Sequence, residues 1–99
     1  MSEAVLLAGA GIEFHTAFAR YEETNLHRAE LFDDAIDKGL RQIGLFPRSA
    51  PEYIGRYRRL VLGHFPYALY YAIDGLRVYV HAILDPRTPL ATIRRRLGI

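Results

Sequence analysis

Arginine and histidine are the residues of this sequence whose types could support chemistry on a phosphate. All but one of the 13 basic residues are arginine, and Lys38 is the exception. Arginine binds phosphate and carboxylate through a planar fork of N–H donors that lysine lacks. His81 is expected on the same strand face as Arg59, and a histidine near arginines could act as a general base on an RNA 2′-hydroxyl. A lone histidine in such a place is more often an ordinary surface residue, so both interpretations stay open.

Other catalytic arrangements are not indicated. The chain has no cysteine, and no pair of histidines has a zinc-like spacing together with a carboxylate on the same face. We therefore predict no metal site and no cofactor. Asp33 and Asp37 fall on one helical face, but with no pocket implied a solvated face is expected. The sequence contains neither a glycine-rich phosphate loop nor a serine nucleophile motif. The histidines are His15, His27, His64 and His81.

Acidic and basic residues are segregated along the chain, although the formal net charge is only +2. Residues 1–46 contain 4 basic and 8 acidic residues, whereas residues 47–99 contain 9 basic and 3 acidic ones. A GC-rich genome would explain the preference for arginine but not the segregation. The C-terminal half is therefore expected to meet a polyanion or an acidic protein surface. Arg94-Arg95-Arg96 would extend that surface, or would simply place cations at the favourable end of a helix dipole.

The elements that must position these residues begin with a helical hairpin. A short strand is predicted at residues 4–8, followed by two apolar stripes at helical spacing. Asn25 is a plausible N-cap between the two helices, and the short connection predicts an antiparallel pair. Gly44 and Pro47 end the second helix. The stripes are Phe14, Ala17, Phe18 and Tyr21, then Ala29, Phe32, Ile36, Leu40 and Ile43.

After a predicted loop at residues 48–55, the period changes from that of a helix to that of a strand. Asp74-Gly75 is a strong two-residue hairpin signal, and residues 90–97 could add one or two helical turns. The predicted strands cover residues 57–62, 67–73 and 76–84. The expected fold is a single α+β domain over residues 1–99. In it the N-terminal helical hairpin packs on one face of a three- to four-stranded antiparallel sheet.

Alternation divides this sheet into two faces. One face should pack against the helices through Leu60, Leu62, Leu69, Tyr71, Ile73, Val78 and Val80. The other should stay open and carry Arg59, Val61, Ala68, Tyr70, Arg77, Tyr79 and His81. A basic and aromatic surface of this kind binds nucleic acid through phosphate contacts and base stacking. Because tyrosine is also common in sheets for packing alone, Tyr70 and Tyr79 stay open to both interpretations.

No apolar run in the sequence is long enough to cross a bilayer. The stretch at residues 4–10 is short and lacks a preceding basic region, which argues against a signal peptide. A small domain without disulfides weakly suggests a reducing compartment. We therefore expect a soluble, cytoplasmic protein with no membrane partner.

One stretch resembles a known family. The run from Tyr57 to Tyr71 is similar to the core signature of the RelE/ParE toxin superfamily, in which an Arg-Arg-Leu strand leads into Phe-Pro-Tyr, an apolar pair and Tyr. The strand at residues 78–84 and the exit Asp85-Pro86-Arg87-Thr88-Pro89 continue the pattern. The resemblance covers nearly the whole chain, and the Phe-Pro-Tyr region is its fairly specific part.

The resemblance implies the toxin of a type II toxin–antitoxin module, which arrests growth, can stabilise a plasmid and is neutralised by a cognate antitoxin. The ParE branch poisons DNA gyrase, whereas the RelE branch cleaves messenger RNA on the ribosome. At positions where the cleaving enzymes carry basic residues, this sequence has Arg59 and Arg87 but also Val61 and Ala68. Ile93 falls near the place of the family's tyrosine. The ParE branch is therefore expected, and a RelE-like mRNA interferase is the alternative.

The same resemblance implies the site residues. If the protein is a ribonuclease, the catalytic residues would be Arg59, Arg87 and His81. Because arginine does not deprotonate at neutral pH, the histidine would have to supply the proton transfer. The residues expected to bind the target or the antitoxin are Arg58, Arg59, His64, Tyr70, Arg77, Tyr79, Arg87, Arg94, Arg95 and Arg96.

Overall fold

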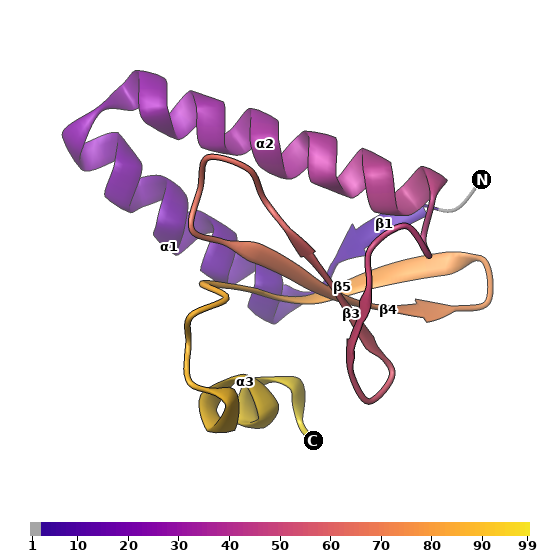
Figure 1. Ribbon diagram of the computed structural model, residues 1–99. Coiled ribbons are helices and arrows are strands. Elements are labelled where there is room, and N and C mark those ends of the chain that lie inside the picture. The colour runs from indigo at the N-terminus through magenta and orange to yellow at the C-terminus, as the bar shows by residue number, and fades with distance from the viewer. Residues whose placement is uncertain (1–2) are drawn as a thin grey trace.

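The computed structural model describes residues 3–99 and places helices on both faces of one sheet (Figure 1). In chain order the elements are β1 (Glu3–Leu6), α1 (Ala8–Thr24), α2 (Leu26–Leu45), β2 (Glu52–Ile54), β3 (Tyr57–Val61), β4 (Ala68–Asp74), β5 (Arg77–Leu84) and α3 (Leu90–Leu97). The predicted α+β fold, in which an N-terminal helical hairpin packs on the sheet, is confirmed. Within the described residues, no helix is long and apolar enough to cross a membrane.

The hairpin of α1 and α2 turns through a single residue, Asn25. The Asn25 side chain accepts a hydrogen bond from the Arg28 amide at 3.2 Å, so it caps α2 as predicted. Between the helices, the Phe14 and Phe32 rings stack with centroids 5.7 Å apart, and Tyr21 lies 5.2 Å from Phe32. This aromatic seam closes the hairpin and leaves the aspartates of α2 facing water.

The sheet has the strand order β1-β5-β4-β3-β2, so it contains five strands rather than three or four. β3, β4 and β5 form the predicted antiparallel meander, whose last turn is Gly75-Leu76 with Gly75 at φ 60°. β1 pairs in parallel with β5, which makes the sheet mixed. β2 lies within residues 48–55, which the sequence predicts as loop. That prediction is wrong because a three-residue strand with an irregular register is too short to show alternation.

The helix-facing side of the sheet carries the main core, as predicted. Leu62, Leu69, Tyr71, Val78 and Val80 are buried there, and Leu60 and Ile73 are half-buried. Gly39 of α2 is buried against this face. A Cβ on Gly39 would lie 3.0 Å from Leu69 Cδ1 and 3.3 Å from Leu62 Cδ2. The missing side chain therefore lets α2 approach the leucines of the sheet closely.

The opposite face is not open, because α3 returns over part of it (Figure 1). Ile93 and Leu97 of α3 pack into one buried cluster with three alanines of the sheet, Ala68, Ala72 and Ala82. Ala68 and Tyr70 are fully buried, so the prediction that both lie on an open surface is wrong. Alternation places them on the correct face but cannot show that the tail covers it. This second core consists of Tyr57, Ala68, Tyr70, Ala72, Ala82, Ile93 and Leu97.

A bulge in β5 sets the position of His81. Tyr70 pairs with Ala82 and Tyr71 pairs with Val80, so His81 has no partner of its own in β4. The extra residue shifts the alternation by one. As a result Ala82 faces α3, whereas the next residue of β5 packs beneath the helical hairpin.

Candidate functional site

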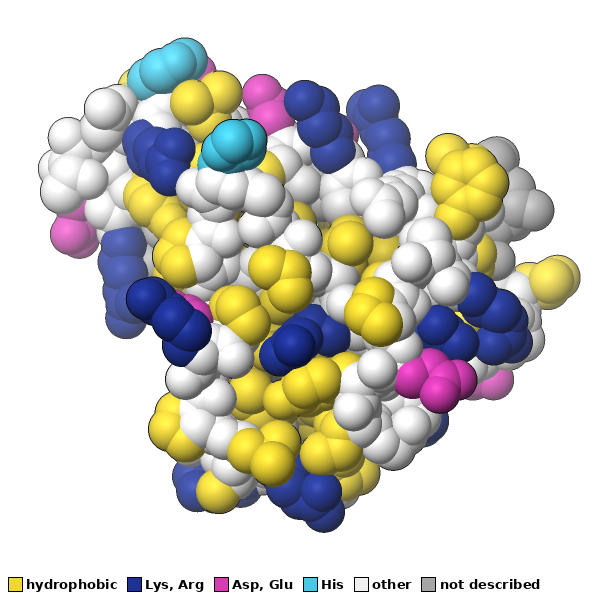
Figure 2. All heavy atoms as spheres, in the orientation of Figure 1, with side chains coloured by type: hydrophobic (Ala, Val, Ile, Leu, Met, Phe, Trp, Pro, Cys, Tyr) yellow, Lys and Arg dark blue, Asp and Glu magenta, His cyan; other side chains and the backbone are white. Residues whose placement is uncertain are grey.

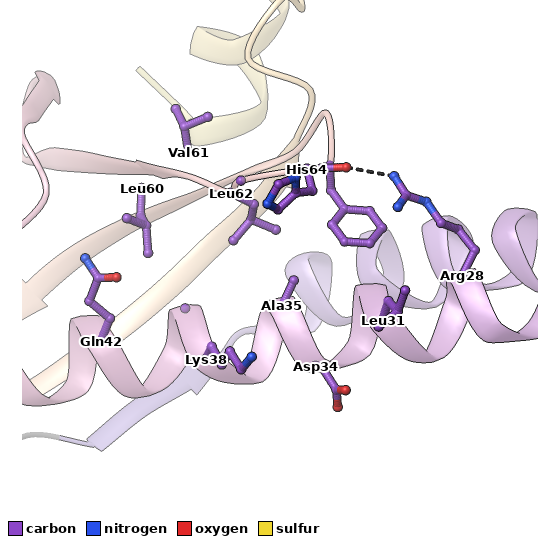
Figure 3. Close-up of a pocket in the computed structure, with 13 residues that line it drawn as sticks. Arg28, Leu31, Asp34, Ala35, Lys38, Gln42, Leu60, Val61, Leu62 and His64 are labelled. Atoms are coloured by element: carbon purple, nitrogen blue, oxygen red, sulfur yellow. Dashed lines mark hydrogen bonds between the residues drawn. The ribbon is translucent and has the colours of Figure 1, made fainter.

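A groove of about 490 Å³ runs between α2 and β3. Leu60 and Leu62 point from the sheet toward α2, whereas Val61 points away from it (Figure 3). Leu31 and Ala35 face the groove from the helix and complete its apolar lining. The polar residues that line the groove are Arg28, Asp34, Lys38, Gln42 and His64.

The loop between β3 and β4 closes one end of the groove. Arg28 Nη2 donates a hydrogen bond to the His64 carbonyl oxygen at 2.7 Å (Figure 3). The Arg28 guanidinium also lies over the Phe65 ring, 4.1 Å from its centroid. His64 has φ 68°, a left-handed conformation that is uncommon for residues other than glycine. These contacts hold the loop in one shape and leave the His64 side chain exposed at the groove.

β3 also offers a free edge beside the groove. β2 pairs only with the first two residues of β3, and the Pro51 carbonyl accepts the Arg59 amide at 3.2 Å. Beyond that point, no strand of the described chain covers this side of Leu60 and Val61. Val61 is 52% exposed. A free strand edge with an apolar side chain is suited to pairing with an extended segment of another polypeptide.

Arg59 lies on the face of β3 away from the helical hairpin, as predicted. Its guanidinium packs over the Tyr53 ring, 4.2 Å from the centroid, and Tyr53 meets Tyr70 edge-on at 5.6 Å. Within the described residues, the buried Tyr70 hydroxyl has no hydrogen bond of acceptable geometry. Burial raises the pKa of Tyr70, and the nearby Arg59 guanidinium offsets only part of that effect. An aromatic stack, rather than a carboxylate, therefore holds Arg59 in place.

His81 occupies a different part of the same face. Its ring packs edge-on against Tyr57, with centroids 5.0 Å apart, and Arg96 Nη2 donates to its carbonyl oxygen at 2.8 Å. Burial lowers the pKa of His81, and the charges of Arg56 and Arg96 lower it further. His81 is therefore mainly neutral at pH 7. The sequence predicts that Arg59 lies within reach of His81. The cations whose charges act on His81 are instead Arg56 and Arg96.

Two arginines of the predicted binding set are engaged by their neighbours. Arg58 Nη1 donates to the Ala50 carbonyl at 2.7 Å, and Arg58 Nη2 lies 3.3 Å from Glu52 Oε1. Arg87 Nε and Nη2 bind the Asp85 carboxylate at 2.7–3.3 Å, and this contact lowers the pKa of Asp85. Arg58 thus braces the loop before β2, whereas the exposed Arg87 pair leaves its guanidinium at the surface.

Arg96 is engaged more completely. Its Nε and Nη2 bind the two oxygens of Glu13 at 2.9 and 3.0 Å, and Glu13 Oε1 also accepts the Ile83 amide at 3.0 Å. Gly9 leaves the space that the guanidinium occupies, because a Cβ there would collide with it. The ion pair therefore holds α3 against α1. Its carboxylate also accepts a hydrogen bond from the Ile83 amide, in the part of β5 that lies beyond the pairing with β1.

The remaining residues of the predicted set do not converge on one point. His64, Arg77, Arg94 and Arg95 are exposed, and Tyr79 is half-buried. On the face shown in Figure 2, hydrophobic side chains run through the middle, and Lys and Arg side chains lie both among them and along their border. Such a surface suits binding of a partner.

Sequence reasoning missed the residues that α2 contributes to the groove. Leu31, Ala35, Lys38 and Gln42 recur at helical spacing and form a second, narrower stripe beside the main one. A helix with two adjacent stripes, of which only one reaches the core, is the signal that could have indicated a groove.

These features define the class of the molecule: a small α+β domain whose sheet carries a helical hairpin on one face and a free strand edge beside a groove. No protein-family model and no curated protein matches the sequence. A solved structure of the chromosomal ParDE toxin–antitoxin system from P. aeruginosa contains a similar chain. The TM-score is 0.75 at 13% sequence identity, and the match covers 86% of this chain and 96% of that chain. This chain therefore shares its fold with a chain of the ParDE system.

Proposed function

We propose that this protein is the toxin of a type II toxin–antitoxin module, that a cognate antitoxin neutralises it, and that it inhibits growth by acting on DNA gyrase. The observation that carries the proposal is the likeness of fold to a chain of the ParDE system over 86% of this chain. The RelE/ParE signature between Tyr57 and Tyr71 supports the same conclusion from the sequence.

The groove between α2 and β3 is the surface proposed to receive the antitoxin. An extended segment could add a strand at the free edge of β3, and its apolar side chains could enter between α2 and the sheet. Two cationic side chains, Arg28 and Lys38, line the groove, against the single carboxylate of Asp34. This balance favours an acidic antitoxin segment.

The residues at the catalytic positions favour gyrase over messenger RNA cleavage. Val61 and Ala68 cannot exchange protons, and Ala68 is fully buried. The His81 ring packs edge-on against Tyr57, and among the described residues no hydrogen bond joins it to Arg59. RNA cleavage without a metal needs groups that activate the 2′-hydroxyl and protonate the leaving oxygen. The arrangement of these residues offers no such pair at one place.

Ribosome-dependent cleavage of messenger RNA is the second candidate, and one observation favours it. Arg59 and Arg87 are both held by a neighbouring side chain, Arg59 over the Tyr53 ring at 4.2 Å and Arg87 on the Asp85 carboxylate at 2.7 Å. Two arginines could stabilise a phosphorane. They match two of the positions that the resemblance implies for the cleaving branch.

One preparation of the protein tests both targets. It is added to DNA gyrase with plasmid DNA, and in parallel to ribosomes programmed with messenger RNA whose ends are mapped. Loss of supercoiling activity with trapped DNA breaks is expected. Unaltered supercoiling without trapped breaks would overturn the gyrase assignment, and A-site cuts that Arg59→Ala abolishes would establish the alternative. Expression alone should arrest growth, and normal growth would contradict both.

The antitoxin groove has a separate test. The product of the adjacent reading frame is co-expressed with the double variant Leu31→Glu/Val61→Glu, because Leu31 and Val61 are 41% and 52% exposed and tolerate the change without unfolding. We expect the variant to arrest growth but to escape neutralisation. Ile12→Glu on α1 is the matched control and should still be neutralised. Neutralisation of the double variant would place the antitoxin elsewhere.

A further inference from the structure

A second exposed surface lies where α2 ends and the β4–β5 hairpin turns. It is a shallow hollow of about 580 Å³ and shares no lining residue with the groove. Leu45 and Phe46 form one side of it, and they are 50% and 65% exposed. We call it the end surface, and its residues are Leu45, Phe46, Pro47, Arg48, Ser49, Ile73 and Gly75.

The segment that presents Phe46 is held firmly. The Tyr71 hydroxyl donates to the Pro47 carbonyl at 2.6 Å, and Arg58 Nη1 donates to the Ala50 carbonyl at 2.7 Å. The Ser49 amide donates to the Phe46 carbonyl at 3.0 Å, which closes a turn. An exposed aromatic side chain on a fixed segment costs little entropy when it is buried by a partner, and such residues dominate binding energies.

The one charged residue that lines the end surface, within the described chain, is Arg48. A neighbouring hollow of about 330 Å³ shares Arg48, Ile73 and Gly75 with it and is also lined by Arg56, Arg58 and Glu52. The Glu52 carboxylate is paired with Arg58 at 3.3 Å. None of the ion pairs within the described residues uses Arg48. An exposed arginine is thus left beside an exposed phenylalanine and a half-buried isoleucine.

We infer that the end surface is a docking site for a polypeptide segment that carries an apolar side chain next to a carboxylate. The apolar side chain would enter the hollow against Phe46 and Ile73, and the carboxylate would meet the fork of Arg48. The inference goes beyond the proposed function, because the end surface is separate from the groove and does not depend on a toxic activity. The small hollow takes one or two side chains, so a short linear segment bound weakly is expected.

A second copy of this chain is a poor occupant for the same site. A twofold contact through Phe46 would bring Arg48 of one copy toward Arg48 of the other, together with the arginines of the neighbouring hollow. Like charges at such short range disfavour the contact. Charge complementarity therefore favours an acidic partner over self-association.

The test uses peptides displayed on phage. Random twelve-residue peptides are selected on the immobilised full chain and counter-selected on its Phe46→Ser variant. Enriched peptides are then synthesised and titrated into the wild-type protein. The comparison variants are Phe46→Ser and Arg48→Gln, and Ile12→Ser on α1 is the control because Ile12 is 68% exposed and lines neither hollow. Circular dichroism checks that each variant is folded.

We expect the enriched peptides to share an apolar residue beside Asp or Glu. Their affinity should fall about tenfold in Phe46→Ser and roughly fivefold in Arg48→Gln, and it should not change in Ile12→Ser. Three outcomes would overturn the inference. They are no peptide whose binding depends on Phe46, a consensus without acidic residues, and self-association of the wild-type protein that Phe46→Ser abolishes.

Discussion

At the scale of single residues, two buried tyrosines on the α3 side of the sheet differ in one hydrogen bond. The Tyr57 hydroxyl donates to the Leu97 carbonyl at 3.1 Å, whereas the Tyr70 hydroxyl, although close to the Arg59 guanidinium, has no hydrogen bond of acceptable geometry among the described residues. A buried polar group without a partner costs about 1–3 kcal/mol, and a satisfied hydrogen bond contributes about 1 kcal/mol. The two hydroxyls should therefore affect the free energy of unfolding in opposite directions.

We expect Tyr70→Phe to leave the free energy of unfolding unchanged or raise it by up to about 1 kcal/mol. Tyr57→Phe, the matched variant, should lower it by about 1 kcal/mol because the Leu97 carbonyl loses its donor. Urea unfolding followed by circular dichroism measures both. A larger loss in Tyr70→Phe than in Tyr57→Phe would mean that the Tyr70 hydroxyl is hydrogen-bonded in solution.

The pH dependence of stability should carry a contribution from His81. Its pKa in the folded protein lies below the ordinary value of 6.5, chiefly because of burial and also because of Arg56 and Arg96. The unfolded chain then binds more protons than the folded one as pH falls below 6.5, so stability is lost between 6.5 and the folded pKa. Above 6.5 the contribution is constant.

We expect urea midpoints of the wild-type protein to fall between about pH 7 and about pH 5, and His81→Gln to reduce that fall. An NMR titration should show that the imidazole of His81 protonates at lower pH than an ordinary histidine. A His81 titration at or above the ordinary histidine range would contradict the depressed pKa.

At the scale of elements, the Glu13–Arg96 pair holds α3 against the sheet. The side chains of Arg96 and Glu13 are 32% and 20% exposed, so this pair is screened less than a surface pair. We expect Glu13→Gln to lower the free energy of unfolding by about 1–2 kcal/mol and to speed amide exchange in α3. Hydrogen exchange read by mass spectrometry measures the second effect.

The matched control removes an exposed carboxylate. Asp37→Asn breaks the pair with Arg41, whose side chains are 62% and 75% exposed, and it should cost less than about 0.5 kcal/mol. It should leave exchange in α3 unchanged. Equal effects of the two substitutions would show that the contact between α3 and α1 is not what secures the helix.

The helix α3 shows what the sequence can and cannot predict. Periodicity predicts the hairpin, the Asn25 cap, the meander and both faces of the sheet, because these depend on residues within one or two turns or on adjacent strands. The docking of α3 depends on Glu13 and Arg96, which are 83 residues apart, and on the space above Gly9. No local sequence pattern indicates such a contact. For this reason the sequence predicts Tyr70 at the surface, whereas the structure buries it beneath α3.

The candidate site also contains some features that the sequence predicts and others that it does not. The outward direction of Arg59 follows from strand alternation, and the structure agrees. The bulge at His81 and the engagement of Arg58 and Arg96 by neighbouring groups depend on the assembled molecule. The groove needs α2 and β3 together, and neither segment indicates it alone.

At the scale of the whole molecule, the two halves differ in charge, with 8 acidic and 4 basic residues before position 47 and 3 acidic and 9 basic residues after it. Arg94 and Arg95 remain exposed on α3. We expect Arg94→Gln/Arg95→Gln to elute from immobilised heparin at lower salt than the wild-type protein, because two cations leave the basic side. Chromatography over a salt gradient measures the shift.

Arg20→Gln/Lys38→Gln on the helical hairpin removes the same net charge from the acidic half. It should shift elution less, since those positions lie among carboxylates. Equal shifts would mean that heparin responds to net charge alone and that the segregation of charge has no bearing on where a polyanion binds.

The parallel pairing of β1 with β5 has a consequence for folding during synthesis on the ribosome. Ala4 pairs with Val78, so the first strand made must wait for the last before it gains its neighbour. A nascent chain that has emerged only as far as the hairpin keeps the apolar underside of α1 and α2 uncovered, and pairings so distant in sequence form late. The complete sheet, with both of the proposed docking surfaces beside it, therefore forms only after β5 has left the ribosome.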